Sequence, residues 1–105
     1  MSRNREINNL VSQITRSFKP EKIILFGSHA YGKAQPDSDI DLMVIMKTRK
    51  NTLDAAAAVR QAIEHTYPID IIVRTPAQIK QRLKWGDSFI RQIMEKGKVV
   101  YEASG

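Results

Sequence analysis

The chain has 105 residues and contains no cysteine, one tryptophan and only short apolar runs. Without cysteine, it has no disulfides, no thiolate nucleophile and no zinc site built on cysteine. No apolar run approaches the ~20 residues that a membrane-spanning helix needs, and the N-terminus leads into no signal-peptide core. We therefore expect a cytoplasmic protein.

The composition that remains is that of a globular domain with a basic balance of charge. Hydrophobic residues make up 42% of the chain and charged residues 27%, and the formal net charge is +6. This length fits one domain with one core, and we expect that domain to span residues 1–105. The positive charge favours contact with phosphates or acidic surfaces. Nucleic acid is a candidate partner, but no aromatic-rich motif for single strands is visible.

Hydrophobic periodicity predicts an α/β fold. Apolar residues with helical spacing mark helices at 7–18, 53–65, 76–83 and 89–96, and short apolar runs mark strands at 22–26, 39–46, 69–73 and 98–102. A turn or short helix is expected at 28–31. Thr52 is the expected cap of the second helix, and Thr75 with Gln78 forms a capping box before the third. We expect a mixed sheet with helices mainly on one face.

Three acidic residues lie in or beside these strands. Asp39 and Asp41 are two residues apart at the head of one apolar run, so a strand turns them to the same face. Asp70 lies inside another apolar run. Carboxylates ~4 Å apart repel one another by roughly 1 kcal/mol per pair in water and by about 4 kcal/mol at an effective dielectric of 20. This cost predicts that a positive group lies among them.

Two familiar ligand-binding motifs are present only in part. Residues 27–34 have the glycine and lysine spacing of a P-loop, but Ala34 replaces the serine or threonine that holds magnesium. Residues 37–48 place three aspartates as in an EF-hand, but Leu42 stands where glycine is needed and Thr48 where a bidentate glutamate is needed. Neither motif accounts for the acidic cluster.

The pattern that does account for it is Gly27-Ser28, ten residues, Asp39-Ile40-Asp41, and then Asp70 on a later strand. This pattern resembles the nucleotidyltransferase superfamily that includes DNA polymerase beta and kanamycin nucleotidyltransferase. At this length, the chain is most similar to the minimal nucleotidyltransferase (MNT) proteins. The motif covers about residues 22–75, and by size the resemblance extends to the whole chain.

The resemblance implies a role for each motif residue. Asp39, Asp41 and Asp70 would be the catalytic residues and would hold two Mg²⁺ ions, and Asp70 would also help to deprotonate the acceptor hydroxyl. The nucleotide-binding residues would be Gly27, Ser28 and Ser38. The implied reaction transfers a nucleoside monophosphate, AMP from ATP, to a hydroxyl group and releases pyrophosphate.

The resemblance also implies a partner. MNT proteins are typically antitoxins paired with helical HEPN toxins, and they act by binding the partner or by attaching AMP to one of its tyrosines. A HEPN-type protein or a second copy of the chain is therefore the expected partner. The alternative to an enzyme is a non-catalytic antitoxin that neutralises its HEPN partner by occlusion.

Simpler interpretations of the acidic residues remain open. Asp41 could pair with Lys33 and Asp70 with Arg74, as ordinary ion pairs. If the site does bind a nucleotide, then Lys33, Arg49 and Arg74 are expected to flank it and to reach phosphate.

Several further residues have weaker predictions. Two follow the Gly-Ser pair and are expected either to contact the nucleotide or to lie on the surface: His29 and Tyr31. Three are expected to pack at helix ends or in the core: His65, Tyr67 and Trp85. Two apolar residues share the strand face of the aspartates and, if helices cover mainly the other face, form a candidate dimer or partner surface: Met43 and Ile45.

Overall fold

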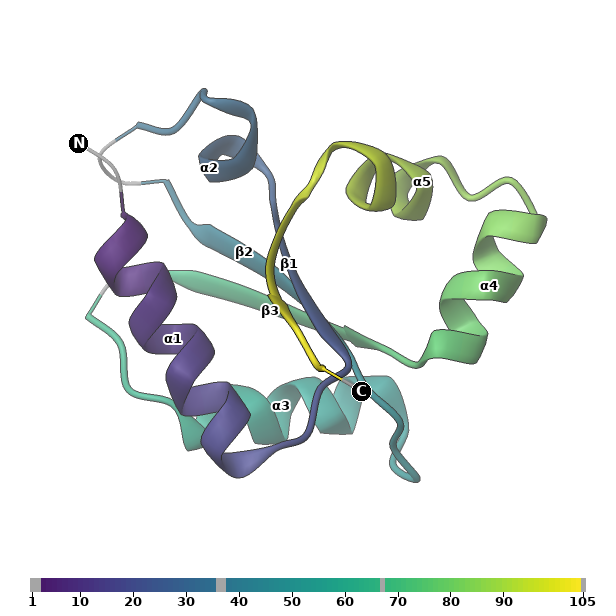
Figure 1. Cartoon of the computed structure of the whole chain (residues 1–105), viewed down its shortest axis with the longest axis horizontal. Helices are drawn as coiled ribbons and strands as arrows, with labels where there is room; N and C mark the ends of the chain where they lie inside the picture. The colour runs from purple at the N-terminus through teal and green to yellow at the C-terminus, as the bar shows by residue number, and fades with distance from the viewer. Residues whose placement is uncertain (1–2, 36–37, 67, 105) are drawn as a thin grey trace.

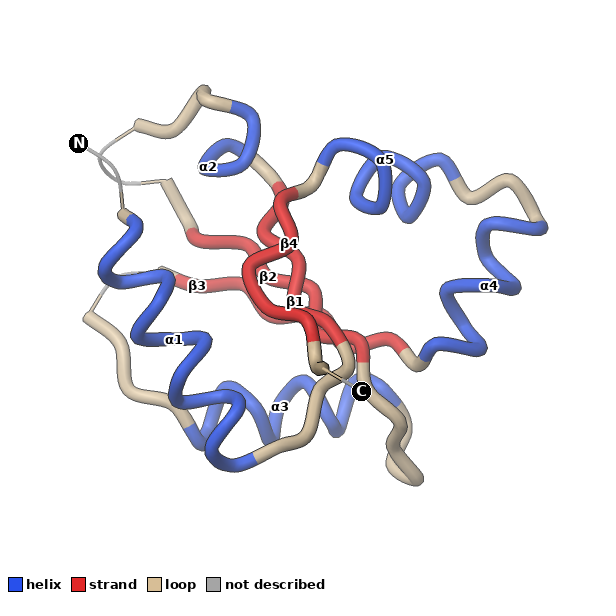
Figure 2. The backbone as a smooth tube through the Cα atoms, in the orientation of Figure 1, coloured by secondary structure: helices blue, strands red, loops and turns tan. Residues whose placement is uncertain are grey.

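The computed structural model describes residues 3–35, 38–66 and 68–104, and Tyr67 lies outside this description. The strands form one four-stranded sheet, which lies between two groups of helices in Figures 1 and 2. In chain order the elements are α1 (Asn4–Ser17), β1 (Lys22–Phe26), α2 (Ser28–Tyr31), β2 (Ile40–Ile45), α3 (Thr52–Ala62), β3 (Ile69–Arg74), α4 (Pro76–Lys84), α5 (Ser88–Lys96) and β4 (Lys98–Glu102).

The sheet is mixed, as the sequence predicts. The strand order is β3-β2-β1-β4, in which β1 pairs antiparallel with β2 and with β4, while β2 and β3 are parallel. The connection between β1 and β2 holds only α2 and a loop, which is enough to reverse the chain direction. The parallel pair is joined through α3, since parallel neighbours need a longer crossover connection. This topology brings the end of β1 and the beginnings of β2 and β3 to the same end of the sheet.

One face of the sheet packs against α1 and α3. Leu42 and Val44 of β2 point to this side and are fully buried, together with Ile14 of α1 and Val59 of α3. The alternation of side chains along β2 assigns even-numbered residues to this face. The core on this side is therefore built from helices that precede and follow β2 in the sequence.

The other face of the sheet packs against α4 and α5 (Figure 1). The sequence predicts helices mainly on one face, whereas the structure has helices on both faces. Met43 and Ile45 are buried against Ile79 of α4 and Ile90 and Ile93 of α5. The expected open apolar face around Met43 and Ile45 is therefore wrong. The apolar stripe of α5 finds its partner within the same chain.

The helix ends are mostly where capping rules predict them. The capping box of Thr75 and Gln78 is present at the start of α4, with both reciprocal hydrogen bonds formed. At α3 the cap is Asn51 rather than Thr52, because the Asn51 side chain accepts a hydrogen bond from the Asp54 amide at 2.8 Å. α3 ends at Ala62, where the chain turns extended and buries Ile63.

Trp85 does not pack in the core. Its side chain is 66% exposed at the C-terminal end of α4. The sequence does not predict this exposure, because Trp85 follows Leu83 in an otherwise amphipathic segment.

Within the residues that the structure describes, no helix is both long and apolar enough to cross a membrane.

Candidate functional site

The three aspartates lie at the end of the sheet where β1 ends and β2 and β3 begin. Figure 1 shows α2 beside this end of the sheet. Asp41 is the register partner of Phe26 on β1 and of Asp70 on β3. Residues paired in register on neighbouring strands point to the same face of a sheet. Asp41 and Asp70 therefore face the same side, and Ile72, two residues further along β3, packs with α4 and α5 on that side. Asp39 is exposed and lies directly before β2.

Gly27 is fitted closely against Asp41. Its backbone has φ +75° and ψ −158°, a region that is essentially restricted to glycine. A Cβ atom on residue 27 would overlap the Oδ2 atom of Asp41. Glycine is needed here for two independent reasons, conformation and space. The carbonyl of Gly27 then accepts hydrogen bonds from the amides of Ala30 and Tyr31, which begins α2.

The pKa of Asp41 is raised to about 6, from an ordinary value of 3.8. Burial is the largest cause, and the negative charges of Asp70 and Asp39 add to it, while the His29 side chain acts in the opposite direction. These causes show that the three carboxylates interact electrostatically, as the sequence predicts. Lys33 is not among the groups that act on Asp41, which argues against the simple ion-pair interpretation.

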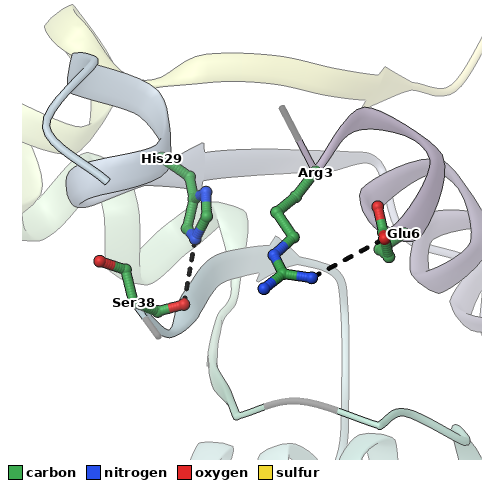
Figure 3. Close-up of polar contacts among 4 residues, drawn as sticks. All are labelled: Arg3, Glu6, His29 and Ser38. Atoms are coloured by element: carbon green, nitrogen blue, oxygen red, sulfur yellow. Dashed lines mark hydrogen bonds and ion pairs between the residues drawn. The ribbon is translucent and has the colours of Figure 1, made fainter. Parts of the chain in front are cut away.

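His29 connects α2 to the segment that carries Asp39. Its Nε2 atom lies 3.1 Å from the carbonyl oxygen of Ser38, as Figure 3 shows. The Ser38 hydroxyl accepts a hydrogen bond from the Gln35 amide at 2.7 Å, so this serine also has a local role in the turn. We therefore interpret His29 as a positioning residue.

Figure 3 also shows the ion pair of Arg3 with Glu6, at 3.8 Å, at the start of α1.

Not all predicted phosphate ligands are near the aspartates. Arg74 ends β3 opposite Ile45, four residues and roughly 13 Å along the strand from Asp70, at ~3.3 Å per residue. Arg49 lies in the loop after β2 and lines a cavity with Phe18. The expectation that these two arginines flank the site is wrong, because the strands carry them to the opposite end of the sheet. Lys33, by contrast, is exposed just after α2.

An aromatic pair lies next to the site and was not predicted from the sequence. Phe26, the register partner of Asp41, contacts Phe89 of α5 edge to face, with ring centroids 5.8 Å apart. Phe89 is 50% exposed, whereas Phe26 is buried. The apolar stripe of α5 predicts a core role for Phe89. Only the position of α5 across the sheet shows that this ring contacts Phe26, the register partner of Asp41.

The donor set fits a divalent cation of the magnesium type. Within the described ranges, no three His, Cys, Asp or Glu side chains lie close enough together to form a complete metal cage. Mg²⁺ does not need one, since it is usually held by one or two carboxylates while water and substrate phosphates complete its shell. Asp41 and Asp70, in register and mutually repelling, provide such a partial set of hard oxygen ligands. Asp39 is close enough to add to it electrostatically.

Comparison with known proteins agrees with this geometry. A family model described as "Nucleotidyltransferase domain" matches residues 6–100. Two proteins of Methanocaldococcus jannaschii are similar along almost the whole chain. "Putative protein adenylyltransferase MJ0604" is 27% identical over 96% of this chain and 100% of the relative. "Putative protein adenylyltransferase MJ0141" is 27% identical over 89% of this chain and 90% of the relative.

Solved structures share the fold. A crystal structure described as a putative nucleotidyltransferase from Sulfolobus solfataricus superposes with a TM-score of 0.67, at 23% identity, over 93% of this chain and 78% of that one. A chain of a toxin-antitoxin crystallised with AMP-PNP gives a TM-score of 0.56, at 22% identity, over 92% of this chain and 74% of that one. The family model covers nearly the whole sequence and includes every residue of the candidate site. The chain therefore belongs to the nucleotidyltransferase domain family.

Proposed function

We propose that this nucleotidyltransferase is a magnesium-dependent protein adenylyltransferase, which transfers AMP from ATP to a hydroxyl group on a partner protein. The observation that supports the proposal most strongly is the placement of Asp41 and Asp70 in register on parallel strands, next to Gly27. The names of the two relatives from Methanocaldococcus jannaschii support the choice of a protein acceptor. The toxin-antitoxin neighbour with AMP-PNP supports the adenine nucleotide and the partner.

Each site residue has a proposed task. Asp41 and Asp70 would provide ligands for Mg²⁺, and the exposed Asp39 would add its charge beside them, so that the metal would supply positive charge to the triphosphate. Gly27 lets the backbone approach the phosphates because it has no side chain. Ser28 begins α2 directly after this glycine and donates hydrogen bonds to phosphate oxygens. Ser38 contributes a polar group from the segment before β2.

The proposed reaction is a displacement at the α-phosphorus of ATP. The acceptor oxygen forms a bond to that phosphorus, and the bond to the bridging oxygen of the β-phosphate breaks, so that pyrophosphate leaves. Asp70 accepts the proton of the acceptor hydroxyl, since it is the more exposed of the two register-paired carboxylates. A tyrosine of a partner toxin of the HEPN type is the proposed acceptor.

We propose that the partner protein presents that hydroxyl to the site. The residues from α1 to β4 account for one sheet and its helical layers. A protein acceptor supplies its own scaffold.

The test is a label-transfer assay with purified protein, Mg²⁺ and extract of the source cells as the supply of acceptors. ATP labelled on the α-phosphate should label a protein band, and ATP labelled on the γ-phosphate should not. The Asp39→Ala/Asp41→Ala double variant should lose the transfer, and the Asp54→Asn variant, which changes an acid in the first turn of α3, should retain it. Transfer of the γ-label instead would contradict the proposal.

A non-catalytic antitoxin is the second candidate function, favoured by the toxin-antitoxin neighbour. It predicts that the double variant still neutralises a HEPN-type partner, measured as recovery of growth in cells that express both proteins. Loss of neutralisation together with loss of label transfer supports the enzyme. Neutralisation that is unchanged in the double variant supports occlusion.

A further inference from the structure

The surface cavity at the other end of the sheet has the features of a protein-docking site. It measures about 330 Å³ and lies between the start of α3 and the outer side of α4. Its lining includes Leu53, Arg74, Gln78, Gln81, Arg82 and Trp85. We propose that this cavity binds an acidic segment of the acceptor protein, anchored by an apolar side chain, and so holds the acceptor at a second point away from the aspartates. This inference rests on the proposed function for the identity of the partner.

Two large apolar side chains are exposed at this cavity. Leu53 is 81% exposed and Trp85 is 66% exposed, although both are large and both line the same cavity. They come from different helices, so one amphipathic helix pattern does not explain the pair. Apolar side chains that gather in one concave place mark a binding surface more strongly than isolated exposed residues do.

The charge of the cavity is positive. Among the residues that the structure describes, its lining contains two arginines and no acidic residue. Arg74 donates a hydrogen bond to its own strand at the Val73 carbonyl, 2.8 Å away, which fixes the side chain and leaves most of its N–H donors for a ligand. The Cζ atom of Arg82 lies 5.9 Å from the centroid of the Trp85 ring. Its Nη1 atom lies 3.8 Å from Oδ2 of Asp87, which makes a long ion pair with an exposed arginine. Carboxylates of an incoming segment complement both guanidinium groups.

The residue composition of the cavity lining is that of a protein interface. Tryptophan and arginine are the residues most enriched at the energetic centres of protein interfaces. Here a tryptophan, a leucine and two arginines lie around one cavity, with glutamines at its edge. Surfaces that bind single-stranded nucleic acid use successive aromatic rings, whereas this cavity has one. The lining therefore favours a peptide with an apolar anchor over an oligonucleotide.

The cavity is separate from the candidate active site. Arg74 and Asp70 lie at opposite ends of β3. A segment bound at Arg74 leaves the aspartates free, so docking and transfer are distinct steps that separate variants can test.

The only tryptophan of the chain lies in the cavity, so its fluorescence reports binding directly. The probe is a synthetic amphipathic peptide with leucines on one face and glutamates on the other. Control peptides replace all glutamates by glutamine, or all leucines by serine. We expect a saturable shift of Trp85 emission with the first peptide and about ten-fold weaker binding or less with either control. A single-stranded oligonucleotide of similar length is the remaining probe.

Protein variants make the test specific to the cavity. Leu53→Ser and Arg74→Glu should each weaken peptide binding by about ten-fold or more. Lys80→Glu, on α4 but outside the cavity lining, and Val99→Ser, exposed on β4, should leave it unchanged. Leu53 is so exposed that its replacement should not affect folding, which circular dichroism verifies.

The outcomes separate this inference from the proposed function. The Asp39→Ala/Asp41→Ala variant should bind the peptide normally, and Leu53→Ser should bind Mg²⁺-ATP normally. Failure of the peptide to shift Trp85 emission, equal binding of the glutamine peptide, or tighter binding of the oligonucleotide would overturn the docking site. None of these results depends on whether AMP is transferred.

Discussion

Gly27 lies so close to Asp41 that residue 27 has no room for a side chain, because a Cβ atom there would overlap Oδ2 of Asp41. The contact joins the end of β1 to the head of β2 across their antiparallel pairing. It therefore fixes the carboxylate beside the backbone that begins α2. In the proposed enzyme, this is the point where the metal ligands and the phosphate-binding turn meet.

Gly27→Ala should lower stability by about 1–3 kcal/mol, because its backbone angles are strained for any residue with a Cβ. It should also displace Asp41 and reduce label transfer by about 10²-fold or more, since small displacements of reacting groups have effects of that size. Gly86→Ala is the matched control: Gly86 also has a positive φ, +81°, but a Cβ there meets nothing within 4 Å. Gly86→Ala should lose stability and keep full activity per folded molecule, measured by urea denaturation and label transfer. Equal activity of the two variants would contradict the account.

Asp70→Asn should lower the pKa of Asp41 from about 6 toward 3.8, because the charge of Asp70 contributes to the raised value. His29→Gln should raise the pKa of Asp41, because the His29 side chain acts to lower it. NMR titration of the Asp41 carboxyl carbon in metal-free protein measures both shifts. Shifts of the same sign in the two variants would show that the charges are not arranged as described.

Asp41→Asn should stabilise the metal-free protein at neutral pH. The folded-state pKa of Asp41, about 6, is above its ordinary value of 3.8, so the folded protein binds a proton more tightly than the unfolded chain does. The wild type therefore loses stability as pH rises through this interval, and the variant lacks this loss. Urea denaturation at several pH values should show the advantage of Asp41→Asn above pH ~6 and its disappearance below pH ~4. Glu95→Gln, an exposed change on α5, should show no such pattern.

Phe89→Ala should lower stability by about 0.5–1.5 kcal/mol beyond the lost apolar area, because it removes the edge-to-face contact with Phe26. Leu53→Ala is the control, since Leu53 is 81% exposed and its truncation should stay within about 0.5 kcal/mol. Thermal denaturation compares the two variants. A larger loss for Leu53→Ala than for Phe89→Ala would contradict the packing described for α5.

The sequence predicts most of the fold because its apolar runs are short and clearly separated. The strand 22–26 and the strand 98–102 are predicted with the bounds that the structure has, and the capping box of Thr75 marks the start of α4 correctly. The distribution of helices is less predictable. Met43 and Ile45 indicate a covered face, but no local signal tells which helix returns to cover it. That choice depends on the turn between α4 and α5.

Strand periodicity predicts a shared face for Asp39 and Asp41, but β2 begins at Ile40, directly after Asp39. The shared face of Asp41 and Asp70 depends on the register of two parallel strands, which only the structure gives. The glycine requirement at position 27 agrees with its positive φ. The arginines are not predictable in this way. In the sequence, Arg49 and Arg74 come after the aspartates of β2 and β3. The two ends of a six-residue strand lie far apart, however, so these arginines lie far from the aspartates. Phe89 and Trp85 likewise depend on how α4 and α5 are placed.

The most direct test of the central claim is isothermal titration calorimetry of the wild type and the Asp39→Ala/Asp41→Ala variant with AMP-PNP, in Mg²⁺ and in EDTA. The account predicts saturable binding to the wild type with Mg²⁺, and binding that is strongly weakened both by EDTA and by the double substitution. Binding of equal strength in all four combinations would show that the aspartates and the metal do not hold the nucleotide, and would contradict the account.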